Sequence, residues 1–248
     1  MLEALGAYTA MQIAAAVLAT FVAAFVRGLA GFGFAILLVP ILALALTPVE
    51  AVLATNFMAL FVGLSEIRKL VRQAERSALV IGPLVLLATA PGLIALAATP
   101  PDLARLLIAL VALAAFGTML LPQRSAAVPG PVYTGAAGLS SGLLTGFAGM
   151  PGVPLVPYYV GRDIPRQVAK ASLLLIFTIA AFAGLASGFA IGRLEWSLFW
   201  LALLLFPAVL LGNWLGGKLF GRITDRVWRT AVGTVLFAAA GAALVKLF

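Results

Sequence analysis

The segment from Arg27 to Phe34 places a positive side chain and three glycines inside an otherwise apolar run. Glycine costs a helix interior roughly 1 kcal/mol relative to alanine, so Gly28, Gly31 and Gly33 together predict a break in the helix. A helix that restarts at Phe34 has first-turn amides without intrahelical partners, and it presents the positive end of its dipole. Such helix ends bind anions. We therefore predict an anion site built from Arg27, the three glycines and Phe34.

A second glycine-rich break is predicted between Gly146 and Pro154, with a new helix beginning near Val153–Leu155. Irregular backbone at membrane depth is tolerated only where protein buries it or water reaches it. We expect the two restarted helices to converge from opposite sides of one site. Gly146, Gly149 and Gly152 would contribute backbone groups to it.

Three uncharged polar residues, Thr55, Asn56 and Ser172, are expected at matching depths in the helices that follow the two breaks. Their hydroxyl and amide groups can complete the coordination of an anion. The alternative is hydrogen bonding between helices, worth about 0.6 kcal/mol on average in membranes. The sequence leaves both interpretations open.

Charged residues in apolar segments are functional candidates, but long basic side chains also extend to the lipid headgroups. Both interpretations apply to Arg27 and to Lys170, which we include among the candidate substrate contacts. Glu50 is the carboxylate that we expect close to a break, and a proton-coupling role is one interpretation of it. A solvated residue at a helix start after Pro48 is the favoured interpretation of Glu50.

The chain contains no cysteine and no histidine, which removes thiol chemistry, the usual general base and the commonest metal ligands. Asp102, Asp163 and Asp225 all lie near predicted loops, so no acid–base pair or metal triad can be assembled within the membrane. We therefore expect neither an enzyme nor a resident metal or cofactor. The net charge of +8 is attributed to orientation in a lipid bilayer and not to nucleic acid binding.

Composition places the chain among membrane proteins: 64% of the residues are apolar, 10% are charged, and the mean hydropathy is +1.17. We predict an all-α polytopic protein. The predicted apolar segments are Ala10–Val26, Phe34–Leu46, Val49–Ser65, Ser77–Ala98, Leu103–Leu121, Pro131–Thr145, Leu155–Val160, Arg166–Ser187, Trp196–Gly217 and Trp228–Leu247.

An internal duplication is indicated by two proline pairs with the same spacing of eight residues, Pro40 with Pro48 and Pro157 with Pro165. The predicted first repeat is 1–121, with a hairpin at 10–46 and spans at 49–65, 77–98 and 103–121. A linker at 122–130 follows. The second repeat is 131–248, with a hairpin at 131–160 and spans at 166–187, 196–217 and 228–247.

The distribution of Lys and Arg favours hairpins that return to the side from which they enter. Twelve Lys/Arg then fall on one face, including those of Glu66–Arg76 and Lys218–Arg229. Positive residues concentrate in the cytosol, so both termini are predicted to be periplasmic. A helix that is broken but fully crosses the membrane is the alternative. With hairpins, each half crosses the membrane an odd number of times, so the two repeats have inverted orientations. In transport, one repeat would then rock against the other.

Small residues at four-residue spacing, in Gly138–Gly146 and Gly212–Gly216, allow helices to approach closely. The contact can lie within the chain or between the subunits of a homodimer. Both possibilities stay open.

At Gly28–Pro40, Gly142–Pro157, Pro48–Asn56 and Pro165–Ser172 the chain resembles the sulfite exporter TauE/SafE family of bacterial membrane proteins. The resemblance implies a secondary transporter of the inner membrane that exports a small anion such as sulfite, sulfoacetate or another organosulfonate. The anion would be held at the midplane between the two breaks. An uptake permease or channel for another small solute is the alternative. Direction of transport and coupling ion are not specified by the sequence.

Overall fold

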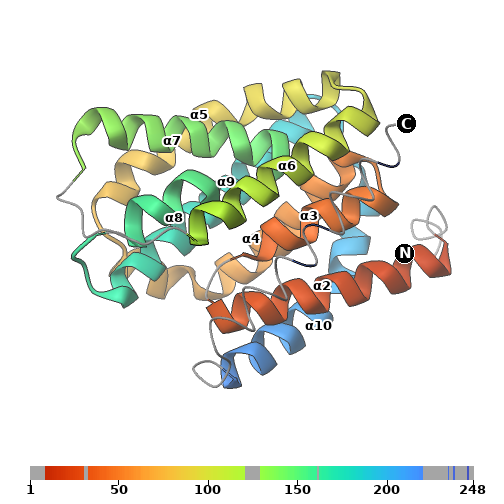
Figure 1. Cartoon of the computed structure of the whole chain (residues 1–248), viewed down its shortest axis with the longest axis horizontal. Helices are drawn as coiled ribbons and strands as arrows, with labels where there is room; N and C mark the ends of the chain where they lie inside the picture. The colour runs from red at the N-terminus through yellow and green to blue at the C-terminus, as the bar shows by residue number, and fades with distance from the viewer. Residues whose placement is uncertain are drawn as a thin grey trace.

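The computed structural model describes residues 9–30, 33–120, 129–160 and 162–219, together with 234, 237 and 245. The secondary-structure elements in this part of the chain are helices (Figure 1). They are α2 (Ala10–Ala30), α3 (Phe34–Ala45), α4 (Pro48–Gln73), α5 (Ser77–Ala98), α6 (Pro101–Leu120), α7 (Pro131–Ala148), α8 (Gly152–Val160), α9 (Arg166–Ala190) and α10 (Trp196–Lys218).

Five of these helices, α2, α4, α5, α9 and α10, are long and apolar enough to cross a membrane. The prediction of an all-helical polytopic membrane protein is confirmed. Most of the span predicted at 228–247 and most of the linker at 122–130 lie outside the described residues.

The first break is the turn of a hairpin. The 21 residues of α2 are about 31 Å long at 1.5 Å per residue. The shorter α3 runs back along α2, because the Gln12 side-chain amide at the start of α2 donates a hydrogen bond to the Ala45 carbonyl at the end of α3, at 3.0 Å. Gly33 makes the turn with φ of 96°, a left-handed conformation that costs other residues about 1–2 kcal/mol. The chain thus returns to the side from which it entered.

The second break is also the turn of a hairpin. Gly149 ends α7 in the left-handed conformation, with φ of 68°. The returning α8 reaches the beginning of α7, where the Tyr158 and Thr134 hydroxyls are hydrogen-bonded at 2.9 Å. The Tyr158 ring stacks on Tyr133 with centroids 5.8 Å apart. The structure therefore has returning hairpins at both positions, and not broken helices that continue across.

Both breaks are narrower than predicted. Helix α2 continues through Arg27 and Gly28 to Ala30, and α7 continues through Gly146 to Ala148. A Cβ on Gly28 would lie 2.5 Å from the Asn213 carbonyl oxygen of α10. A Cβ on Gly146 would collide with the α5 backbone at Thr89. These two glycines let helices pack closely, and that contact offsets their low helix propensity.

The order of helices is the same in the two halves. The starts of α3 and α8 are 118 residues apart, as are those of α4 and α9, and the starts of α5 and α10 are 119 residues apart. Helices α4 and α9 run antiparallel, since Gly63 lies against Thr178 whereas Gly188 lies against Leu53. Corresponding helices therefore point in opposite directions, as in inverted repeats. The exact division into 1–121 and 131–248 stays a prediction.

The most extensive contacts join α2 to α10 and α5 to α7. Each of these pairs combines one helix of the first half with one helix of the second half. Each pair is parallel and closely packed along small residues. Along α2 and α10, Gly212 meets Phe21 and Gly216 meets Phe25. The small-residue stretches of the sequence are thus accounted for within the chain. A homodimer stays an untested prediction.

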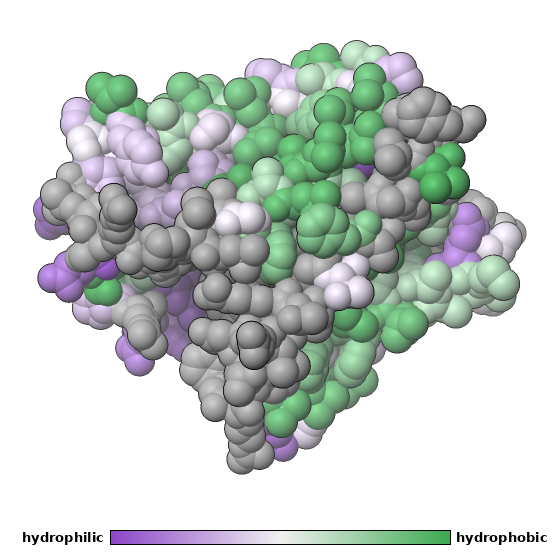
Figure 2. Space-filling model, viewed as in Figure 1, coloured by the Kyte–Doolittle hydropathy of each residue, from purple (hydrophilic) through white to green (hydrophobic). Residues whose placement is uncertain are grey.

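Hydrophilic residues gather at one end of the molecule (Figure 2, left), where the α8–α9 connection lies in Figure 1. Here the Arg162 guanidinium makes two 2.6 Å hydrogen bonds to the Glu75 carboxylate of the α4–α5 connection. The neighbouring carboxylate raises the pKa of Arg162. The Ser77 and Tyr159 hydroxyls lie 2.7 Å apart beside this pair. The basic loops around Glu75 and Arg162 therefore share one face, as the hairpin topology requires.

Candidate functional site

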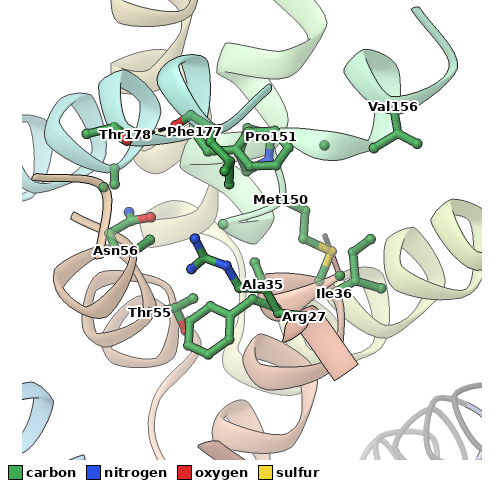
Figure 3. A pocket seen from close by; sticks show the side chains of 18 of the residues that line it. Arg27, Ala35, Ile36, Thr55, Asn56, Met150, Pro151, Val156, Phe177 and Thr178 are labelled. Carbon is green, nitrogen blue, oxygen red and sulfur yellow. Dashed lines mark hydrogen bonds between the residues drawn. The ribbon is translucent and has the colours of Figure 1, made fainter. Parts of the chain in front are cut away.

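One cavity lies between the two hairpin turns and is closed laterally by α4 and α9 (Figure 3). The space between its walls, counted together with its open mouth, is about 770 Å³. The residues that line it are Arg27, Gly33, Phe34, Ala35, Ile36, Thr55, Asn56, Ala59, Gly63, Glu66, Leu70, Gly149, Met150, Pro151, Gly152, Val156, Leu174, Phe177, Thr178 and Ala181. The two hairpin turns, which are more than a hundred residues apart in sequence, thus line the same cavity.

Arg27, in the last turn of α2, extends its guanidinium into this cavity (Figure 3). The guanidinium carbon lies 5.9 Å from the centroid of the Phe34 ring, which favours this placement of the cation. Among the described residues Arg27 forms no ion pair and no hydrogen bond. Its five N–H donors can therefore be used by a bound anion.

The first turn of α3 forms the wall beside Arg27. Gly33 is the N-cap of α3 and provides no side-chain cap. The amides of Phe34, Ala35 and Ile36 are in the positions that lack intrahelical partners, and all three residues line the cavity. Amide donors and a positive helix end thus adjoin the guanidinium.

The second turn provides fewer donors than predicted. The Gly149 amide bonds to the Thr145 carbonyl at 2.9 Å, and the Met150 amide bonds to the Leu144 carbonyl at 3.1 Å. Pro151 has no N–H, and its carbonyl accepts a hydrogen bond from the Ser141 hydroxyl at 2.9 Å. The anion-binding capacity of the cavity is therefore concentrated on the α2–α3 side.

Asn56 of α4 also lines the cavity, and the residue is 3% exposed. Its amide nitrogen lies against Gly184 of α9 and has no hydrogen-bond partner in the described chain. An unpaired buried donor costs about 1–3 kcal/mol, which a ligand acceptor would recover. Thr55, beside it, donates its hydroxyl hydrogen to the Ala51 carbonyl at 2.8 Å, so its oxygen is left as an acceptor.

Seven of the twelve predicted contacts line the cavity: Arg27, Gly33, Phe34, Thr55, Asn56, Gly149 and Gly152. Gly31 lies outside the described residues. Four others lie elsewhere. Gly28 and Gly146 are in helix–helix contacts, and Lys170 is exposed away from the cavity. Ser172 accepts a hydrogen bond from the Glu75 amide at 2.8 Å and donates to the Val168 carbonyl. A binding role for any of the twelve stays a prediction.

The sequence interpretation missed Glu66, Phe177 and Thr178, which also line the cavity. The span predicted at 49–65 ends one residue before Glu66, but α4 continues past it to Gln73. The signal that could have identified Glu66 is its register: Asn56, Ala59, Gly63, Glu66 and Leu70 follow at intervals of three and four residues and form one face of α4.

The cavity wall is mainly apolar, and its charged residues within the described chain are Arg27 and Glu66. No cluster of three metal-ligating side chains occurs among the described residues. Such a wall suits a small ligand with a negative group and little need for further polar contacts.

Comparison with known families gives one match, to the family described as "Sulfite exporter TauE/SafE", over residues 16–243. The comparisons with curated proteins and with solved structures give no match.

Proposed function

Because the chain belongs to the sulfite exporter TauE/SafE family, we propose that it is a secondary transporter that exports a small sulfur-containing anion: sulfite, sulfoacetate or another organosulfonate. The observation that carries the proposal is the Arg27 guanidinium, which lies in the cavity between both hairpin turns and has no anionic partner within bonding distance among the described residues. A sulfonate or sulfite oxygen would accept hydrogen bonds from Arg27 and from the first amides of α3.

Asn56 would complete the site. Rotation about its χ2 exchanges the positions of the amide oxygen and nitrogen, and it would bring the unpaired donor toward the anion. Transport would require alternating exposure of the cavity to the two sides of the membrane. We place the protein in the bacterial inner membrane with both termini in the periplasm, because the basic Glu75–Arg162 face would then be cytosolic.

The test is flux of labelled sulfite and sulfoacetate through the purified chain in liposomes, for the wild type, Arg27→Ala, Arg27→Lys and Arg193→Ala. Charge-assisted hydrogen bonds contribute about 1.5–3 kcal/mol, so Arg27→Ala should weaken anion affinity by roughly ten- to a hundredfold. Arg27→Lys keeps the charge but not the planar donor set, and it should be intermediate.

Arg193, an exposed residue after α9, is the matched control and should transport as the wild type does. Absence of flux for both anions in the wild type would refute the proposed function. Unchanged affinity in Arg27→Ala would remove Arg27 from the site. Transport of a neutral or cationic solute in its place would support the uptake permease or channel.

A further inference from the structure

Glu66 is the carboxylate that lines the cavity in the described part of the chain. It lies on the cavity face of α4, ten residues after Asn56, and its side chain is exposed at the open part of the site. It forms no ion pair with any described residue, whereas Glu75 is bound by Arg162 and Asp102 by Arg105. Arg27 and Glu66 thus line the same cavity.

Among the described residues, the other elements around the cavity contribute no further charged side chain. Helix α3 presents Phe34 to Ile36, the α7–α8 turn presents Gly149 to Gly152, and α9 presents Leu174, Phe177 and Thr178. Within the described chain the charge balance of the empty cavity is thus one guanidinium against one carboxylate. A mainly apolar wall makes any departure from that balance unfavourable.

We propose that Glu66 binds one proton each time an anion occupies Arg27, so that the transporter moves a proton together with the anion. This rests on the proposed function, since it requires an anion at Arg27. An incoming anion adds one negative charge, or two for sulfoacetate, to the Glu66 carboxylate opposite a single cation, and like charges in one site disfavour each other. Protonation of the carboxylate removes that repulsion.

The steps balance without a further reactant. In the empty cavity the ionised Glu66 neutralises Arg27. When the anion enters, one carboxylate oxygen takes a proton from water on the same side. When the cavity opens to the other side, the anion leaves, the O–H bond breaks to release the proton into that solution, and Glu66 again faces Arg27.

The experiment uses the full-length chain in liposomes with the membrane potential held at zero, with labelled sulfoacetate and labelled sulfite in parallel. Between pH 6 and 8 both acidic groups of sulfoacetate are ionised, so pH then acts on the protein and not on this probe. One proton per anion gives about tenfold accumulation for a gradient of one pH unit, on the side of higher pH. A trapped pH dye should report proton entry with the anion.

Glu66→Gln should still exchange labelled for unlabelled anion at equal concentrations, but it should lose accumulation driven by the pH gradient and lose the dye signal. Glu50→Gln is the matched control on the same helix. Glu50 accepts a hydrogen bond from the Thr47 amide in the capping box of α4, and Gln retains this contact. This variant should behave as the wild type.

A readout that needs no variant is proton uptake in weakly buffered detergent solution: adding sulfoacetate to wild-type protein should remove one proton from solution per anion bound. Accumulation of anion driven by the pH gradient in Glu66→Gln would overturn the inference. Wild-type flux that does not depend on the pH gradient, or anion binding without proton uptake, would also overturn the inference. In either case the proposed function would still stand. If the wild type carries neither anion, the proposed function itself fails.

Discussion

Replacing Gly146 by alanine tests whether this glycine serves packing, as the structure shows, or the anion site, as the sequence predicted. The matched control is Gly135→Ala in the same helix, because a Cβ on Gly135 would meet nothing within 4 Å. Alanine favours a helix interior by up to about 1 kcal/mol over glycine, so Gly135→Ala should raise the free energy of unfolding by that amount.

At Gly146 the same gain is opposed by a collision. The added Cβ would overlap the Thr89 carbonyl oxygen and the Leu93 amide, and it would lie 2.8 Å from the Gly92 carbonyl carbon. These are backbone atoms of α5 and cannot rotate away, so α5 and α7 must separate. Overpacking of this kind costs about 1–3 kcal/mol, and because the gain in helix propensity is common to both variants, they should differ by roughly 1–3 kcal/mol.

Thermal unfolding in detergent measures this difference. About 2–4 °C per kcal/mol applies to a chain of this size, so the melting temperature of Gly146→Ala should lie roughly 2–12 °C below that of Gly135→Ala. Equal melting temperatures would refute the close α5–α7 contact. A Gly146→Ala protein of normal stability that has lost anion affinity would return Gly146 to the binding site.

Three further changes test other parts of the structure. Gly149→Ala forces a left-handed residue with a side chain and should lose about 1–2 kcal/mol of stability in thermal unfolding; a melting temperature equal to the wild type's would argue against the turn described here. Arg162→Ala leaves the Glu75 carboxylate, 26% exposed, without its partner, and should cost about 3 kcal/mol. A double-mutant cycle with Glu75→Ala should show that the two residues are coupled, and additive effects would contradict the ion pair. Asn56→Leu removes an unpaired buried donor and should raise stability by about 1–3 kcal/mol while it weakens anion binding, and a loss of stability would mean that the amide is already satisfied.

Glycine and proline patterns were sufficient to predict where the chain turns back, because only a few residue types accept a left-handed turn and none but glycine accepts it freely. They could not tell Gly33 and Gly149, which make the turns, from Gly28 and Gly146, which pack. That distinction depends on α10 and α5, which are far away in sequence.

The candidate site was predictable in part for a related reason. Arg27 and Asn56 were identified because polar groups in apolar segments are conspicuous, and both line the cavity. Lys170 was chosen as a charged residue in an apolar segment and Ser172 by its depth along the helix, but neither criterion gives the direction in which a side chain points. Glu66 was missed because its helix was expected to end one residue before it. Helical phase, fixed by the packing of α4 and α9 against their neighbours, decides which way all three side chains point.

The parallel pairing of α2 with α10 and of α5 with α7 bears on how the protein can move. Each pair takes one helix from either half of the sequence and is held by backbone-to-backbone contact at glycines. The parts that move against each other therefore cannot be the N-terminal and C-terminal halves, since separating the halves would break both helix pairs. A covalent crosslink within the α2–α10 pair or within the α5–α7 pair should consequently leave transport intact. A crosslink between either pair and the central α4–α9 pair should abolish transport.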